Sequence, residues 1–179
     1  LILNEEEFSK VIEEAMAFAS EHEVLMTVGI KPTRPETGYG YIQVSDHNPI
    51  SKVKSFTEKP SLETAQSFLQ YGEFLWNSGI FIWKVKTIIE AFERYLPEHH
   101  LLFSGVMRTL GTEAEQNSIE IAFAECRAIS IDYGIMERAE NVYVRSGDFG
   151  WSDVGTWGSV YQHARKDRYA NVLPKEGCY

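Results

Sequence analysis

Three short stretches of the chain combine acidic, amide or lysine side chains with glycines and aromatic residues. They are Glu58-Lys59-Pro60, Trp76-Asn77-Ser78-Gly79 and Trp151-Ser152-Asp153-Val154-Gly155. Turns of this composition commonly hold polar small molecules, because functional side chains concentrate in loops carried by a rigid scaffold. A carboxylate only accepts hydrogen bonds and therefore suits sugar hydroxyls, whereas a lysine ammonium neutralises phosphate as a point charge. These stretches therefore favour a site for a sugar phosphate.

The first two stretches also have purely structural interpretations. Taken singly, the Glu58-Lys59 pair is more typical of solvated surface charges before a turn. The amide of Asn77 can both donate to and accept from a ligand hydroxyl, and an asparagine turn is the competing interpretation. Pro60 favours an extended Lys59, so the side chains of Glu58 and Lys59 are expected to point in different directions. Trp76 is expected in the core, because tryptophan is highly buried on average.

Asp153 follows a strand-like segment and lies among glycines, where a carboxylate can serve as a hard oxygen ligand for Mg²⁺. Mg²⁺ commonly uses one or two carboxylates together with substrate phosphates, so a second acid would have to lie elsewhere. A helix-capping or turn aspartate is the competing interpretation. Asp132 raises the same question, since it could face the ligand or cap a short helical segment ending near Arg138.

Gly38 and Gly40 stand just ahead of a strand-like run that starts at Tyr41. Missing side chains at these positions would let a ligand approach the backbone amides, although an ordinary glycine turn explains the pattern equally well. The pair is not a dinucleotide-binding fingerprint, because Gln43 occupies the third glycine position and the segment leads into a strand.

Hydrophobic periodicity predicts helices and strands in an α/β arrangement that would position these residues. The amphipathic helix expected over 5–20 has a capping box formed by Asn4 and Glu7. Later helices are expected after the caps Ser61 and Thr156. Strands are expected over 24–30, 41–44, 53–57, 80–83 and 141–145. Three consecutive helices, over 85–95, 97–110 and 117–126, are expected to cover one face of the sheet.

Composition restricts the class of protein. A chain of 179 residues that is 44% hydrophobic suits one domain with a real core. The net charge of −9, without blocks of like charge, argues against a nucleic-acid partner. A membrane partner is not expected, because no apolar run approaches the roughly 20 residues that span a bilayer. Cys126 and Cys178 are expected as free thiols in a cytoplasmic protein.

Taken in order, six segments of this chain resemble the later part of the nucleotidyltransferase domain in the sugar-nucleotide pyrophosphorylase family, in particular its mannose-1-phosphate guanylyltransferases. The segments are Thr27 to Thr33, Pro35 to Ile42, Phe56 to Pro60, Trp76 to Phe81, Ser130 to Glu137 and Trp151 to Trp157. The resemblance implies a Rossmann-like mixed sheet flanked by helices. It also implies that residues 1–179 are a partial domain, the half that binds the sugar phosphate, and that the N-terminal nucleotide-binding part and any C-terminal extension are absent.

The resemblance also implies roles for individual residues and a cofactor. Lys59 and Asp153 would be the catalytic residues, with Asp153 as a ligand of Mg²⁺. The family's glycine-rich Arg/Lys loop and its second metal-binding aspartate are expected upstream of Leu1. The substrate-binding residues implied are Gly40, Glu58, Lys59, Asn77 and, less directly, Asp132.

The activity implied for the full-length enzyme is transfer of GMP from GTP to mannose 1-phosphate, giving GDP-mannose and pyrophosphate. No side-chain nucleophile is needed, because the attacking group is already an anionic phosphate oxygen. The fragment by itself is expected to be inactive. Two alternatives stay open: a noncatalytic sugar-phosphate-binding or regulatory module, and a glycoside hydrolase using Glu58 and Asp153. The residues alone leave open the nucleotide base, the sugar and the oligomeric state, a homo-oligomer included.

Overall fold

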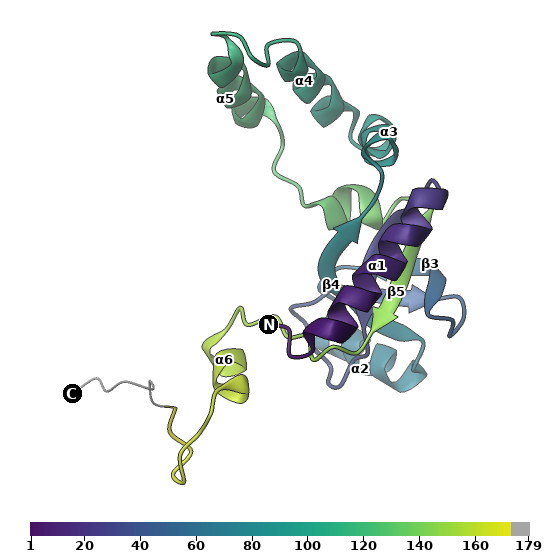
Figure 1. Ribbon diagram of the computed structural model, residues 1–179, viewed down its shortest axis with the longest axis vertical. Helices are drawn as coiled ribbons and strands as arrows, with labels where there is room; N and C mark the ends of the chain where they lie inside the picture. Colours follow the sequence, from purple (N-terminus) through teal and green to yellow (C-terminus); the bar gives the residue numbers. More distant parts are fainter. Residues whose placement is uncertain (173–179) are drawn as a thin grey trace, which may run out of the picture.

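A mixed sheet of five strands forms the centre of the computed structural model, which describes residues 1–172 (Figure 1). β1 and β5 run parallel to one another, and the other neighbouring strands are antiparallel. The strands close into a barrel in the order β1-β4-β2-β3-β5. The mixed α/β fold expected from the sequence is therefore confirmed. The strands are β1 (Leu25–Ile30), β2 (Tyr41–Val44), β3 (Ile50–Thr57), β4 (Phe74–Ile82) and β5 (Val142–Gly147).

Two helices pack on the barrel and follow the capping signals in the sequence. α1 (Glu5–Glu21) contacts β1, β4 and β5 and buries Val11 and Ala15 completely. Its N-cap Asn4 accepts a hydrogen bond from the backbone nitrogen of Glu7. α2 (Leu62–Tyr71) packs on β4 and is capped by Ser61. Apolar spacing and capping residues thus fix where both helices begin and which face they bury.

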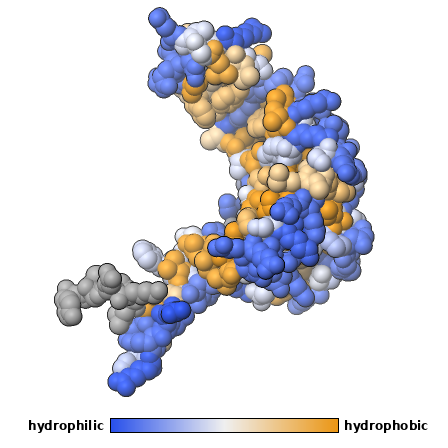
Figure 2. Space-filling model, viewed as in Figure 1, coloured by the Kyte–Doolittle hydropathy of each residue, from blue (hydrophilic) through white to orange (hydrophobic). Residues whose placement is uncertain are grey.

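Three further helices were only partly predicted: α3 (Val85–Tyr95), α4 (Pro97–Met107) and α5 (Glu115–Glu125). α3 packs against the barrel core, whereas α4 and α5 form an arm that extends away from the sheet (Figure 1). The expectation that all three cover one face of the sheet is wrong. The apolar residues of α4 and α5 pack against each other instead, as in the edge-to-face contact of Phe103 and Phe123 at 5.2 Å. Figure 2 shows hydrophobic residues exposed on this arm and on the neighbouring part of the body.

The Trp76-Asn77-Ser78-Gly79 stretch lies inside β4, not in a turn ahead of a strand as expected. The register of β1 with β4 shifts here, since Thr27 pairs with Phe81 while Gly29 pairs with Asn77. Such a bulge interrupts the alternation of a strand and redirects its side chains. Local sequence shows the glycine, but only the pairing with β1 reveals that the strand continues through it.

The last described segment returns to the beginning of the chain. After β5, Leu1 and Ser152 exchange two backbone hydrogen bonds of 2.8 and 3.1 Å. α6 (Trp157–His163) then starts at Thr156, which forms a reciprocal capping box with Ser159. Cys126 is a free thiol, as expected, whereas Cys178 lies outside the described residues. No helix within residues 1–172 combines the length and apolar character needed to cross a membrane.

Candidate functional site

One groove of about 350 Å³ brings together every residue that the sequence nominated for a site. It lies where the loop before β2, the end of β3, the bulge of β4, the π-helical turn η1 (Asp132–Met136) and the segment after β5 meet. Leu1, Tyr39 and Trp151 complete its walls. The nominated residues that line the groove are Gly40, Glu58, Lys59, Asn77, Asp132 and Asp153.

Gly40 makes room for the carboxylate of Glu58. A Cβ atom at position 40 would lie 2.5 Å from Glu58 Oε2, closer than non-bonded atoms approach. The carbonyl oxygen of Gly40 accepts a hydrogen bond of 2.8 Å from the backbone nitrogen of Asn77, which ties this loop to β4. The missing side chain therefore serves the packing of Glu58, in addition to any access that it gives a ligand.

Glu58 and Lys59 do not point in different directions, so that expectation is wrong. Lys59 Nζ lies 3.2 Å from Glu58 Oε1, and the backbone of Lys59 has a left-handed φ of 47°. Tertiary hydrogen bonds override the extended preference of a residue before proline: Lys59 N donates to the carbonyl of Tyr39 at 3.3 Å, and Glu58 N donates to Glu137 Oε1 at 3.0 Å. A left-handed lysine costs about 1–2 kcal/mol, which these bonds must offset.

Asn77 is held in one orientation by its neighbours. Its Oδ1 accepts a hydrogen bond of 2.8 Å from the buried hydroxyl of Thr27, and its Nδ2 donates to Asp132 Oδ1 at 3.1 Å. The backbone nitrogen of Gly79 can only donate and lies 3.2 Å from Asn77 Oδ1, so the amide nitrogen of Asn77 is the atom that faces Asp132. The arrangement places a fixed donor and a carboxylate side by side in the groove.

Two carboxylates in the groove, those of Glu58 and Asp132, are partly buried, and burial makes their charged form less favourable. Burial raises the pKa of Glu58 above its ordinary value, and the negative charge of Asp132 raises it further, although Lys59 acts in the opposite direction. Burial likewise raises the pKa of Asp132, against the favourable effects of Lys59 and Asn77. Glu58 exposes only 10% of its side chain, whereas Lys59 exposes 59%. The site thus has buried acceptors beside an accessible cation.

Asp153 lines the groove from the segment after β5, an exposed stretch next to Trp151 and Ser152. Within the described part of the chain, no three His, Cys, Asp or Glu side chains cluster closely enough to hold a metal ion. A single accessible carboxylate still fits a cation such as Mg²⁺ that takes most of its ligands from substrate phosphates and water. The donor chemistry of Asp153 therefore fits the ion.

Three residues that support the site were not predicted to do so. Tyr39 contributes its carbonyl to Lys59 and its hydroxyl to the backbone of Asp153, at 3.4 Å. Thr27 fixes Asn77, and Glu137 fixes the backbone of Glu58. Glu137 could have been suspected, since it ends the same sequence segment that contains Asp132. Thr27 likewise begins the segment from Thr27 to Thr33 that carries the family resemblance, but nothing in the sequence shows that its hydroxyl contacts Asn77.

The fold and this site define the class of protein. Residues 1–169 match the family described as nucleotidyl transferase. The chain therefore belongs to the nucleotidyl transferase family, as the sequence resemblance predicts.

Its relatives include several proteins with one name. A mannose-1-phosphate guanylyltransferase of Salmonella montevideo is 40% identical over 96% of this chain. One of Escherichia coli is 36% identical over 93% of this chain. The chain spans just over a third of the length of these relatives, 38% and 37% respectively.

Solved structures agree with this placement. A Thermus thermophilus protein described as a mannose-1-phosphate geranyltransferase superposes with a TM-score of 0.80 at 34% identity. That match covers 90% of this chain and 46% of the other. A Helicobacter pylori protein described as a mannose-6-phosphate isomerase gives a TM-score of 0.73 at 25% identity, covering 86% of this chain and 60% of the other.

Proposed function

We propose that this chain supplies the sugar-phosphate half of a mannose-1-phosphate guanylyltransferase, which transfers GMP from GTP to mannose 1-phosphate and releases pyrophosphate. The observation that carries the proposal is the convergence of Glu58, Lys59, Asn77 and Asp132 on one groove that Asp153 also lines. The family and the names of the relatives support the reaction class and the substrates.

The chemistry of the groove matches the two ends of a sugar phosphate. The carboxylates of Glu58 and Asp132 would accept hydrogen bonds from sugar hydroxyls, and the amide of Asn77 would add a donor. The ammonium of Lys59 would neutralise the phosphate whose oxygen attacks the nucleotide. The residues therefore align the nucleophile and reduce charge repulsion, which are the main tasks in phosphoryl-type transfer.

Asp153 is the residue that would hold Mg²⁺ in this half of the site. The ion, when bound, would neutralise the phosphates of the nucleotide. Leu1 and Ser152 are paired through their backbones, so the segment that starts at Leu1 lies beside Asp153. We also propose that a second metal-binding aspartate and the nucleotide-binding part of the domain lie upstream of Leu1 in the full-length enzyme. The proposed location of the enzyme is the cytoplasm.

The test uses the full-length enzyme and measures pyrophosphate release from GTP with mannose 1-phosphate. Lys59→Ala is expected to lose most turnover at an unchanged melting temperature, because its side chain is exposed and carries the charge facing the phosphate. Lys54→Ala is the matched control: it removes the same charge from the neighbouring strand β3, and Lys54 pairs with Glu73 at 3.9 Å away from the groove. Equal kinetics for the two variants would remove Lys59 from the phosphate site.

The metal ligand is tested in the same way by Asp153→Asn, with Asp148→Asn as the exposed control five residues earlier. We expect only Asp153→Asn to raise the Mg²⁺ concentration needed for half-maximal turnover. Wild-type protein that binds mannose 1-phosphate but releases no pyrophosphate would favour the noncatalytic module instead.

A further inference from the structure

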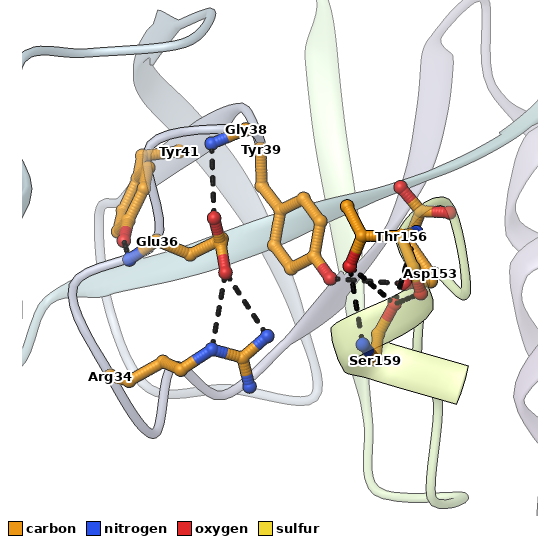
Figure 3. Close-up of polar contacts among 8 residues, drawn as sticks. All are labelled: Arg34, Glu36, Gly38, Tyr39, Tyr41, Asp153, Thr156 and Ser159. Atoms are coloured by element: carbon orange, nitrogen blue, oxygen red, sulfur yellow. Dashed lines mark hydrogen bonds and ion pairs between the residues drawn. The ribbon is translucent and has the colours of Figure 1, made fainter. Parts of the chain in front are cut away.

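Tyr39 contacts two separate segments that line the groove. Its backbone carbonyl accepts the hydrogen bond from Lys59 N at 3.3 Å, and its hydroxyl donates to the carbonyl of Asp153 at 3.4 Å. Figure 3 shows the side chain crossing from the glycine loop toward the Asp153 segment. One residue thus contacts the two segments that carry the phosphate-binding amine and the metal-binding carboxylate.

The ring of Tyr39 is held by two tryptophans. Its centroid lies 5.3 Å from that of Trp76 and 5.3 Å from that of Trp151, and both contacts are edge-to-face. Edge-to-face aromatic pairs contribute about 0.5–1.5 kcal/mol beyond the burial of area. Since Trp76 is only 4% exposed and lies in β4, the ring is anchored to the barrel.

The loop that carries Tyr39 is braced as well. Glu36 accepts hydrogen bonds from Arg34 at 3.1 Å and from the backbone nitrogen of Gly38 at 3.3 Å. The backbone nitrogen of Glu36 donates to the hydroxyl of Tyr41 at 2.9 Å, and Tyr41 is fully buried. These contacts, drawn in Figure 3, give Tyr39 a rigid base.

Asp153 itself has fewer supports. Ser152 is tied to Leu1, and Thr156 caps α6, but the residues between them are exposed. Across residues 1–172, the hydrogen bond from Tyr39 is the one that reaches the backbone of Asp153. This contact therefore helps to set the position of Asp153 relative to Lys59, together with the pairing of Ser152 with Leu1.

We propose that Tyr39 is a positioning residue that fixes the separation of Asp153 and Lys59 across the groove. The inference rests on the proposed function, because it assigns Asp153 to the metal and Lys59 to the phosphate. A segment that moves by even about 1 Å weakens catalysis, since the reacting groups must be held in a near-attack arrangement. Tyr39 would thus affect turnover and metal dependence through Asp153, without touching the reacting atoms.

The test compares two variants of the full-length enzyme that each delete one phenol hydroxyl. Tyr39→Phe keeps the ring and removes the bond to Asp153. Tyr161→Phe removes a bond of the same chemistry, from hydroxyl to the carbonyl of Ala170 at 2.7 Å, on α6 away from the groove. A single hydrogen bond makes a modest net contribution, so we expect Tyr39→Phe to lower kcat by about two- to tenfold.

Two readouts separate positioning from a general loss of stability. Tyr39→Phe is expected to raise the Mg²⁺ concentration for half-maximal turnover, while the KM for mannose 1-phosphate stays unchanged. Without metal or substrate, it is expected to speed hydrogen–deuterium exchange of the amides of residues 153–156. Tyr161→Phe is expected to change neither.

The inference is overturned if Tyr39→Phe leaves both the exchange and the Mg²⁺ dependence at wild-type values, or if Tyr161→Phe alters them equally. Absence of wild-type turnover would refute the proposed function and not this contact, because the exchange measurement needs no activity.

Discussion

Replacing Gly40 by alanine tests how the groove holds Glu58. The added Cβ would lie 2.5 Å from Glu58 Oε2, about 0.9 Å inside the 3.4 Å at which ordinary contact begins. The methyl group has little free space, because Asn77 Cβ at 3.3 Å and Phe56 Cε1 at 3.4 Å are also close to it. The carboxylate, at the end of a flexible side chain, is the group that must move.

The cost follows from the bonds that such a movement breaks. A shift of about 0.9 Å takes the carboxylate out of hydrogen-bond range of the sugar hydroxyl that we propose it binds, and away from Lys59 Nζ, now at 3.2 Å. A hydrogen bond to a charged group contributes about 1.5–3 kcal/mol. We therefore expect Gly40→Ala to weaken the binding of mannose 1-phosphate by about 10- to 100-fold.

Isothermal titration of the full-length enzyme with mannose 1-phosphate measures this loss. Gly38→Ala is the matched control from the same loop, because its Cβ would meet nothing closer than Glu36 Oε1 at 3.5 Å, an ordinary contact. Thermal unfolding of both variants shows whether they fold. Equal affinities for Gly40→Ala and Gly38→Ala would refute the claim that Gly40 makes room for Glu58.

Three further predictions concern stability. Burial raises the pKa of Glu58 and Asp132 above their ordinary values of 4.5 and 3.8. Between the ordinary and the raised pKa of each group, the folded protein therefore holds more protons than the unfolded chain. Stability therefore falls as pH rises through the raised pKa values. Calorimetry of Glu58→Gln and Asp132→Asn should show a raised melting temperature at about pH 7 but not near pH 3.5. A lower melting temperature for both variants at neutral pH would contradict this. Glu14→Ala should lower the free energy of unfolding in urea by about 1–3 kcal/mol, because it leaves the guanidinium of Arg145 without the carboxylate that lies 2.8 Å away. The side chain of Arg145 is only 9% exposed, so water cannot fully replace that partner. An unchanged urea midpoint would show that the ion pair does not stabilise the fold. Gly29→Ala should lower the free energy of unfolding by about 1–3 kcal/mol in the same assay, since its Cβ would lie 2.6 Å from Val144 and 2.7 Å from Leu75 in the core. An unchanged free energy of unfolding would show that the core accommodates the methyl group without strain.

Local signals in the sequence were sufficient for most elements. The caps Asn4, Ser61 and Thr156 each accept the expected hydrogen bond at the start of a helix. Such signals work because capping and apolar spacing involve residues only a few positions apart. The same reasoning failed for α4 and α5, because periodicity identifies an apolar face and not the surface that covers it.

The candidate site shows a similar division. The types of its residues, namely acids, an amide and a lysine beside glycines, are enough to indicate a polar ligand. Their positions relative to one another could not be predicted from the sequence, because the contacting residues are far apart in the chain. Thr27 and Asn77 are 50 residues apart, and Asn77 and Asp132 are 55 residues apart. Contacts over such separations depend on how the strands pair.

The amino-acid sequence by itself determined the chemistry available to this protein, its family resemblance and the start of most helices. Only the tertiary structure decided that β4 runs through Asn77, that Lys59 turns back toward Glu58, and that Tyr39 joins Lys59 to Asp153. The physical reason is that backbone preferences of about 1 kcal/mol are overridden when several long-range hydrogen bonds and buried contacts act on the same residue.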